Sequence, residues 1–173
     1  MIKRHTRAAL ILCLFVSVSE MTFAVGRQYP SISHKDFKRL EGAWQGSLTY
    51  LDYSSGKPYT MPANVEIRRI GNTAEYSWKN IYPDEPRANS ADTVVISSDG
   101  RYVDDEFVVS NEKLADGSWQ IVTEARGRDG NDNKEALIRH TYRISKNNFK
   151  VRKDVQFAGE QNWIMRHEYA YTR

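Results

Sequence analysis

The chain is organised around one segment, Leu40-Glu41-Gly42-Ala43-Trp44-Gln45-Gly46-Ser47-Leu48-Thr49-Tyr50-Leu51-Asp52-Tyr53. Its start has the form of a helix end followed by a glycine hinge at Gly42. From Trp44 onward the residues alternate between the two faces of a long β-strand. Later runs of the same character are expected to return and pack on this first strand. The segment therefore predicts a sheet protein, and by itself it predicts no activity.

The residues before this segment predict a short helix over residues 34–40. Ser33-His34-Lys35-Asp36 has the pattern of an N-terminal cap, with an acidic residue in the first turn. Phe37 and Leu40 are three residues apart and share one helical face. Such a helix would close one end of a barrel. The alternative is an irregular segment, since a helix this short is marginal by itself.

Turn signals divide the rest of the chain at regular intervals. Asp99-Gly100, Asp116-Gly117 and Gly130-Asn131 are typical of hairpins, because these residues tolerate a positive φ. The gaps are too short for parallel crossovers, so neighbouring strands should pair antiparallel. We therefore predict an all-β fold, an antiparallel up-and-down barrel of about 8–10 strands with a short N-terminal helix. The expected strands cover residues 43–53, 60–70, 73–82, 91–98, 101–111, 117–127, 134–145, 148–158 and 162–172.

The first 24 residues have the three parts of a secretory signal peptide. Lys3, Arg4 and Arg7 form a basic start, residues 8–18 are apolar, and Thr22-Phe23-Ala24 places small residues where a signal peptidase reads. The apolar run is too short to span a bilayer. An uncleaved membrane anchor is the alternative. We expect an exported protein, periplasmic or extracellular, with no transmembrane segment after signal cleavage.

The predicted division is therefore a signal peptide over residues 1–24, an N-terminal lead with the short helix over 25–42, and a barrel over 43–173. Removal of the signal lowers the formal charge from +3 to +1, which gives no electrostatic case for nucleic-acid binding. Cys13 is the single cysteine and leaves with the signal. The remaining chain thus has no disulfide, no cysteine nucleophile and no cysteine metal site, and its core alone must hold it.

Gly42-Ala43-Trp44 forms a Gly-x-Trp motif at the start of the first strand, directly after the short helix. This motif resembles the signature shared by lipocalins, fatty-acid-binding proteins and related calycin barrels. The resemblance implies that Trp44 packs across one end of the barrel and that a small ligand binds inside. It covers the chain after the signal as architecture, but only Gly42 and Trp44 as a motif. The chain departs from lipocalins because it lacks their common disulfides and their later loop motifs.

Alternation sorts the side chains of the strands into an inner and an outer face. The ninth strand should turn Trp163, Met165, His167, Tyr169 and Tyr171 inward. A buried, unpaired charge is unfavourable, so an interior with several polar groups indicates water, mutual pairing or a ligand. The polar residues expected inside are Asp52, Arg69, Thr123, His140, Lys153 and His167, with the hydroxyls of Tyr50, Tyr76, Tyr142 and Tyr169. The charged residues expected outside on the last three strands are Arg139, Arg143, Lys150, Arg152, Asp154, Arg166 and Glu168.

Two strands repeat the pattern Arg-His-x-Tyr, as Arg139-His140-Thr141-Tyr142 and Arg166-His167-Glu168-Tyr169. In each, the His and the Tyr share the inner face and the Arg lies outside as a solvated charge. The two strands flank a third, so the His-x-Tyr pairs would lie about 10 Å apart with Lys153 between them. This group could recognise an acidic or polar head group. The alternative is that these are ordinary half-buried sheet residues.

The ligand clamp of fatty-acid-binding proteins is Arg-x-Tyr on one face, so that role does not carry over to the Arg-His-x-Tyr spacing. The candidate ligand-binding residues are Tyr50, Arg69, Trp78, His140, Tyr142, Lys153, His167 and Tyr169.

Other chemistry is less well supported by the sequence. Barrels of the nitrobindin type bind haem through one His, so His140 or His167 could be an axial ligand, although the glycine-rich first strand of that type is matched only in part. Residues 129–135 are rich in oxygen ligands, but they do not have calcium-loop spacing and are interpreted as a polar surface turn. No catalytic motif is present and no metal site is predicted.

These observations predict an exported lipocalin-like protein that binds a small, partly apolar ligand, lipophilic or acidic, inside the barrel. We expect a cavity of about 300 Å³ in that case, and a barrel packed solid without one would contradict the hypothesis. The alternative is a structural or interaction protein of the cell envelope, with a filled barrel and no ligand. An enzyme with its site in the cavity is a third and less favoured hypothesis.

Overall fold

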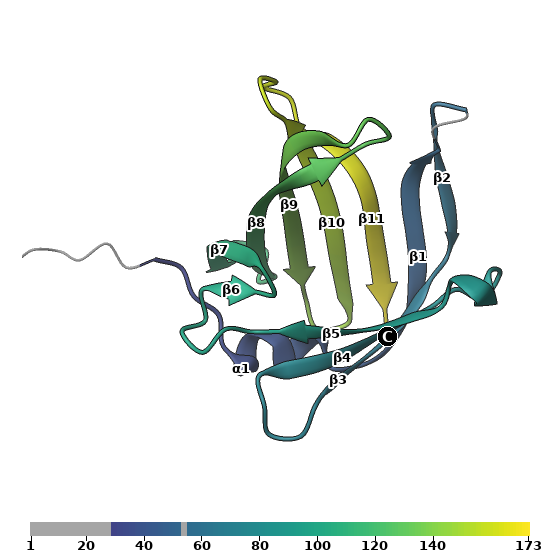
Figure 1. Cartoon of the computed structure of the whole chain (residues 1–173). Helices are drawn as coiled ribbons and strands as arrows, with labels where there is room; N and C mark the ends of the chain where they lie inside the picture. Colours follow the sequence, from purple (N-terminus) through teal and green to yellow (C-terminus); the bar gives the residue numbers. More distant parts are fainter. Residues whose placement is uncertain (1–28, 53–54) are drawn as a thin grey trace, which may run out of the picture.

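A computed structural model describes residues 29–52 and 55–173 of the chain. The predicted signal peptide, residues 1–24, lies outside the described residues. A short helix precedes a single antiparallel sheet that curls into a nearly closed barrel (Figure 1). The predicted fold class is therefore confirmed. Within the described residues, no helix is long and apolar enough to cross a membrane.

The helical segments are α1 (His34–Phe37), η1 (Lys38–Leu40) and η2 (Pro86–Ala88). The strands are β1 (Gly42–Asp52), β2 (Lys57–Pro62), β3 (Asn64–Arg69), β4 (Glu75–Ile81), β5 (Ser90–Val95), β6 (Tyr102–Val103), β7 (Glu106–Lys113), β8 (Trp119–Asp129), β9 (Lys134–Ile144), β10 (Asn148–Phe157) and β11 (Ile164–Thr172).

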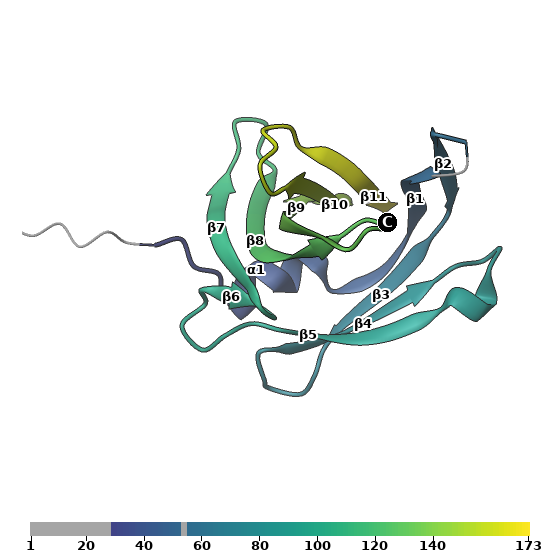
Figure 2. The same cartoon turned by 45° about the horizontal axis from the view of Figure 1, so that its top comes forward.

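Neighbouring strands follow the order β5-β4-β3-β1-β11-β10-β9-β8-β7-β6, with β2 paired to β1. Figure 2 shows β7 to β11 curving around one side of the barrel while β3, β4 and β5 run along the other. A bridge between Ile96 and Val103 brings the two ends of the sheet together. Beside it, Asp104 accepts a hydrogen bond from the Val95 amide at 2.8 Å and donates its own amide to the Val95 carbonyl at 2.7 Å. The barrel is thus closed over a short length only.

The predicted strand over residues 60–70 is wrong in one respect, because it is two strands. The first half of β1 pairs with β3 and the second half with β2, so the partner changes along β1. Gly46 marks this change: its carbonyl accepts the Ala63 amide at 2.9 Å and its amide donates to Asn64 Oδ1 at 3.2 Å. The predicted strand over 101–111 likewise divides into β6 and β7, because Asp104 adopts a positive φ of 53° in a tight turn.

The predicted helix over residues 34–40 is confirmed, with its second turn as the 3-10 segment η1. The Asp36 carboxylate accepts hydrogen bonds from the Ser33 amide at 2.8 Å and the Ser33 hydroxyl at 2.9 Å, which caps the first turn. Phe37 and Leu40 are fully buried in the core. The helix therefore plugs the end of the barrel at which β1 begins (Figure 1).

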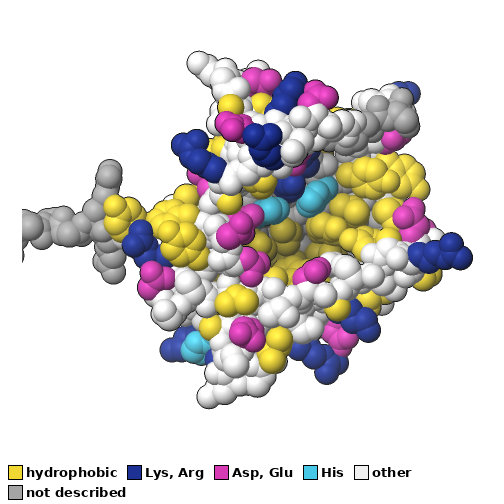
Figure 3. All heavy atoms as spheres, viewed as in Figure 1, with side chains coloured by type: hydrophobic (Ala, Val, Ile, Leu, Met, Phe, Trp, Pro, Cys, Tyr) yellow, Lys and Arg dark blue, Asp and Glu magenta, His cyan; other side chains and the backbone are white. Residues whose placement is uncertain are grey.

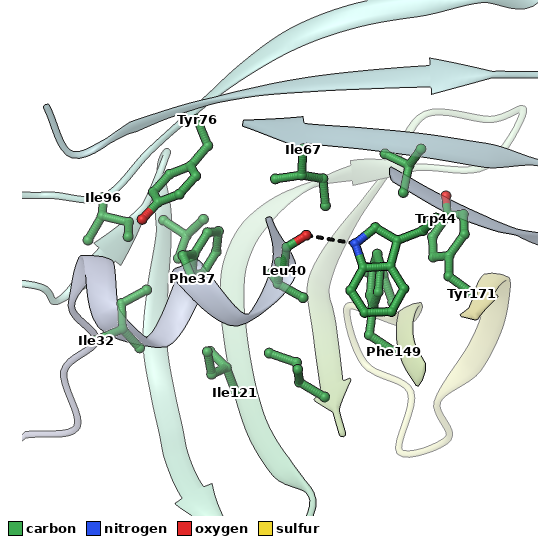
Figure 4. Packing of buried hydrophobic residues seen from close by; sticks show 14 of the residues in the cluster. Ile32, Phe37, Leu40, Trp44, Ile67, Tyr76, Ile96, Ile121, Phe149 and Tyr171 are labelled. Carbon is green, nitrogen blue, oxygen red and sulfur yellow. Dashed lines mark hydrogen bonds between the residues drawn. The ribbon is translucent and has the colours of Figure 1, made fainter. Parts of the chain in front are cut away.

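Trp44 joins this plug to the barrel wall. Its indole nitrogen donates to the Leu40 carbonyl at 2.8 Å, and its ring meets Phe149 edge-on with 4.7 Å between centroids (Figure 4). Tyr76 adds a second link, since its hydroxyl donates to the His34 carbonyl at 2.9 Å. The bottom of the barrel is an aromatic and aliphatic core, so a cavity in the barrel interior lies on the other side of this layer.

The inner face predicted for the ninth strand is wrong at its beginning. A β-bulge lies where Lys153 pairs with His167 but Asp154 pairs with Met165, which leaves Arg166 as the extra residue of β11. His167, Tyr169 and Tyr171 keep the predicted inner face. Met165 instead stands opposite Asp154 on the outer row, and Trp163 lies under the Arg139 guanidinium, with 4.0 Å to the ring centroid.

We expect Gly46→Ala to lower the free energy of unfolding by about 3 kcal/mol, because an added Cβ would lie 2.1 Å from the Ala170 carbonyl oxygen, which is backbone and cannot move aside. Gly127→Ala is the matched control. Its Cβ would meet only the Ile138 side chain, with Cδ1 at 3.0 Å and Cγ1 at 3.9 Å, so we expect a loss of about 1 kcal/mol or less. Urea unfolding measures both, and equal losses would contradict the close approach of β1 and β11.

Candidate functional site

A cavity of about 200 Å³, open to solvent on one side, lies between two walls of the barrel. One wall comes from β4 and β5, and the other comes from β9, β10 and β11. Figure 3 shows histidine side chains within a hollow that is bordered by hydrophobic side chains. The expected cavity of about 300 Å³ is therefore not found, and the smaller space has room only for a molecule below drug size. Its lining residues are Trp78, Asn80, Asp92, Val94, His140, Tyr142, Val151, His167, Tyr169 and Tyr171.

The sheet register places the central polar residues in one row. Thr123 pairs with His140, His140 with Lys153, Lys153 with His167, and His167 with Tyr50. Because these residues are directly opposite one another on successive strands, their side chains share a face. The two His-x-Tyr pairs therefore flank Lys153, as the spacing of the strands predicts.

His140 is held by a carboxylate from β7, two strands away in the sheet. Its Nδ1 lies 2.7 Å and 2.9 Å from the two oxygens of Glu106, at the start of β7, and Thr123 donates its hydroxyl to the same carboxylate. Burial acts to raise the pKa of the Glu106 carboxyl, but the hydrogen bond and charge of His140 and the bond from Thr123 outweigh it and lower the pKa. Glu106 is thus ionised and fixes the orientation of the His140 ring.

Glu106 is not among the candidate site residues predicted from the sequence. It follows Asp104 and Asp105, so the run has the composition of an acidic turn. A signal was nevertheless present, because Glu106 is two residues before the apolar Val108 and so shares its inner face. Val108 is fully buried in the structure.

His167 is neutral over most of the pH range. Burial, followed by the nearby His140 and Lys153, lowers its pKa from 6.5 to about 4. Its ring packs edge-on against Tyr169 with 5.4 Å between centroids. The two imidazoles of the row therefore differ in character: one faces a carboxylate, whereas the other is an uncharged hydrogen-bonding group.

Tyrosine hydroxyls lie below the histidines. The hydroxyls of Tyr169 and Tyr82 are 2.8 Å apart, which links the two walls of the barrel. Burial raises the pKa of Tyr169, with a further contribution from the bond to Tyr82, and burial also raises the pKa of Tyr142 and Tyr171. These phenols stay protonated at any ordinary pH. They supply hydroxyl groups and flat apolar surfaces, and Tyr169 and Tyr171 are parallel, with 5.7 Å between ring centroids.

Asp129 joins Lys153 to Arg166 on the side of the row away from the plug. Lys153 Nζ donates to Asp129 Oδ2 at 2.8 Å, and Arg166 Nε lies 2.6 Å from Asp129 Oδ1. Burial opposes ionisation of the Asp129 carboxyl, but the bond and charge of Lys153 and the charge of Arg166 outweigh it and lower its pKa.

The prediction that Arg166 is a solvated outer charge is therefore wrong, and its side chain is only 10% exposed. The physical reason is the β-bulge, which turns this residue toward Asp129 and over the ring of Phe157. The interpretation of residues 129–135 as a surface turn fails at its first position, since the Asp129 side chain is 11% exposed. Asp132, further along the turn, is 75% exposed as expected.

Five of the candidate ligand-binding residues line the cavity: Trp78, His140, Tyr142, His167 and Tyr169. Lys153 lies in the same row but is engaged by Asp129. Tyr50 ends the row and packs on Tyr59 of β2, with 5.6 Å between centroids, and is not among the lining residues. Arg69 is elsewhere, because it donates to the carbonyls of Thr73 and Asn72 in the turn between β3 and β4.

The cavity is too small to enclose a haem group. The cavity is about 200 Å³, below the range for ligands of drug size, and haem is larger than these. Nδ1 of His140 is engaged by Glu106, which leaves Nε2 as the only nitrogen of this ring that could ligate a metal. Among the described residues, no group of three or more His, Cys, Asp or Glu side chains is arranged to hold a metal ion.

No protein-family model matches the chain, and no curated protein matches it by sequence. Among solved structures, the crystal structure of Rv2717c from M. tuberculosis has a TM-score of 0.48 and 13% sequence identity, and the alignment covers 80% of this chain and 95% of that chain. The class of protein is therefore given by its own fold: a nearly closed antiparallel β-barrel with one end plugged by a short helix and a polar and aromatic cavity inside.

We expect the lowered pKa of His167 to make the protein less stable in mild acid. The contribution of His167 to stability is greatest above pH 6.5 and falls as the pH approaches 4. Between these values His167 binds a proton in the unfolded chain but not in the folded protein. At pH 5 the loss from this group is about 2 kcal/mol relative to neutral pH. In urea unfolding, His167→Gln should remove this part of the slope. His34→Gln, at the exposed start of α1, should leave the slope unchanged.

We expect Asp129→Asn to lower the free energy of unfolding by about 3 kcal/mol, because it leaves the cations of Lys153 and Arg166 side by side without their carboxylate. Adding Lys153→Met to this variant should recover part of the loss. Asp132→Asn, on the exposed turn, should change stability by less than about 0.5 kcal/mol. An Asp129→Asn variant as stable as the wild type in thermal and urea unfolding would contradict the ion-pair assignment.

Proposed function

We propose that this protein is an exported, lipocalin-like binding protein of the calycin type that holds a small, partly apolar molecule inside its barrel. The observation that carries the proposal is the cavity between the wall of β4–β5 and the wall of β9–β11. A protein whose barrel served only as a scaffold would be expected to fill its interior with packed side chains, because interiors pack densely and unfilled space is unfavourable.

The lining supports a ligand with two kinds of surface. Trp78, Tyr142, Tyr169 and Tyr171 offer flat aromatic faces, whereas His140 and His167 offer ring nitrogens. Small-molecule sites commonly combine an apolar lining with a few convergent polar groups that orient the ligand. The dry plug below and the ion pairs of Asp129 above confine the ligand to the level of the His-x-Tyr pairs.

The proposed export rests on the signal-peptide pattern of residues 1–24. Because residues 25–173 contain no cysteine, an exported form must be stable without a disulfide, and the buried plug of Phe37, Leu40 and Trp44 supplies such a core. The cell-envelope scaffold remains the alternative function. The two hypotheses differ in whether the cavity takes up a ligand.

We expect small aromatic molecules to bind with a dissociation constant below about 1 mM, detected by ligand-observed NMR or by a change in tryptophan fluorescence. Val94→Phe adds a ring on the β5 wall of the cavity and should weaken binding at least about tenfold. Val122→Phe is the control, because Val122 lies between the inward Ile121 and Thr123 and so faces out from β8. No saturable binding by the wild type, or equal weakening in both variants, would contradict the proposal.

A further inference from the structure

The cavity holds a carboxylate–imidazole pair whose arrangement restricts the ligand further. Nδ1 of His140 faces the Glu106 carboxylate at 2.7 Å and 2.9 Å, so this nitrogen carries the proton when the ring is neutral. Nε2 is then the nitrogen with a free lone pair. His140 is also a lining residue, so the cavity is where that lone pair can find a partner. The ring is a hydrogen-bond acceptor toward a ligand.

Glu106 also favours the uptake of a proton by His140. When Nε2 takes a proton, the ring becomes an imidazolium, and the carboxylate on Nδ1 stabilises the new charge. Thr123 holds the same carboxylate from below, and the side chains of Glu106 and His140 are only 15% and 22% exposed. The positions of these groups are therefore fixed before a ligand enters.

The buried Glu106 and Asp129 are matched in charge by Lys153 and Arg166, and Asp92 of the cavity lining adds a further carboxylate. An anionic ligand alone would add one more negative charge to this group. A ligand that enters as a neutral acid and passes its proton to His140 would leave the total unchanged, because both the imidazolium and the anion stay in the cavity.

Other titratable groups face His140 from the neighbouring elements. His167 on β11 is neutral, and its uncharged ring does not oppose the imidazolium. Lys153 on β10 is turned to Asp129. The remaining carboxylates are Asp104, in the β6–β7 turn, and Asp92, in the β5 wall. Asp92 lies across the cavity from His140, so an anionic oxygen at Nε2 is placed on the side away from it.

The shape of the lining narrows the class of acid. Tyr169 and Tyr171 are parallel, and Trp78 on the facing wall stands at 90° to the ring of Phe149 beneath. These walls suit a flat ring better than a flexible chain. Because the cavity is about 200 Å³, there is room for one small ring system with few substituents.

We propose that the ligand is a small aromatic weak acid of the phenol type, which is bound as its anion after its hydroxyl proton moves to Nε2 of His140. In this step the O–H bond breaks, its electron pair stays on the phenolate oxygen, and an N–H bond forms on the ring. The inference rests on the proposed function, since it concerns the ligand of the same cavity. Glu106 positions the His140 ring in this proposal and thereby contributes to ligand specificity.

The test uses para-nitrophenol, whose anion absorbs visible light and whose neutral form does not. Its methyl ether, para-nitroanisole, is a matched probe with no proton to give. Both are titrated with the folded protein at a pH below the pKa of free para-nitrophenol, with binding measured separately by ligand-observed NMR. We expect both probes to bind and the ionisation constant of bound nitrophenol to rise at least about tenfold, which appears as the visible band of the anion.

His140→Gln should abolish this rise, to within about twofold of the free probe, because glutamine cannot take the proton. His34→Gln, the matched control outside the cavity, should behave as the wild type. Glu106→Gln should give an intermediate result, since the ring keeps a hydrogen-bond partner but loses the stabilising charge. Imidazole nitrogen NMR of the wild type gives an independent reading, in which His140 gains a second N–H when para-nitrophenol is added.

The outcomes separate this inference from the proposed function. If both probes bind but nitrophenol stays neutral and the His140 imidazole does not change, the inference is overturned while the binding function stands. A visible band that persists in His140→Gln also overturns it, because another group then holds the anion. If neither probe binds the wild type, both proposals fail. Should His140→Gln not fold, the NMR reading of the wild type alone decides.

Discussion

The architecture depends on one contact between helix and barrel, the hydrogen bond from the Trp44 indole to the Leu40 carbonyl. The helical segment ends at Leu40, so this carbonyl is one of those that a helix end leaves without an intrahelical partner. Trp44 satisfies it inside the core, where an unpaired carbonyl would be unfavourable by about 1–3 kcal/mol. The same ring is 1% exposed and buries enough area to contribute about 4–6 kcal/mol of hydrophobic stabilisation. One residue thus fixes the plug, begins β1 and defines the floor of the cavity.

Above this floor the interior changes from apolar to polar in steps set by the strand pleat. The layer of Ile144, Phe149 and Tyr171 belongs to the buried hydrophobic core, and Tyr171 also borders the cavity. The next layer brings tyrosine hydroxyls, and the one above it brings His140, Lys153 and His167. Successive inward residues of a strand are about 6.6 Å apart, so the change takes place within four residues of each strand, about 13 Å. A ligand in the cavity would therefore meet apolar surface at one end and hydrogen-bonding groups at the other.

Much of this arrangement was predictable from local sequence. The helix with its Ser33 cap, most of the strand positions and the inward faces of β9 and β10 follow from period and turn residues, because these depend on neighbours along the chain. The meeting of His140, Lys153 and His167 was also predictable, since three consecutive antiparallel strands with short turns have little freedom in register. The buried position of Arg166 was not predictable, because a β-bulge inserts one residue into a strand without any marked signal in the local sequence.

By itself, the amino-acid sequence determined the class of fold, the plug and the row of inward polar residues, for these are set by alternation and by turns between adjacent strands. Only the tertiary structure decided which charges meet. Glu106 on β7 contacts His140 on β9 across β8. Asp129 forms ion pairs with Lys153 on β10 and Arg166 on β11. Their pairing depends on curvature and on a bulge, and both are properties of the closed sheet. The partner of a buried charge is chosen by distance in space, which alternation along one strand does not encode.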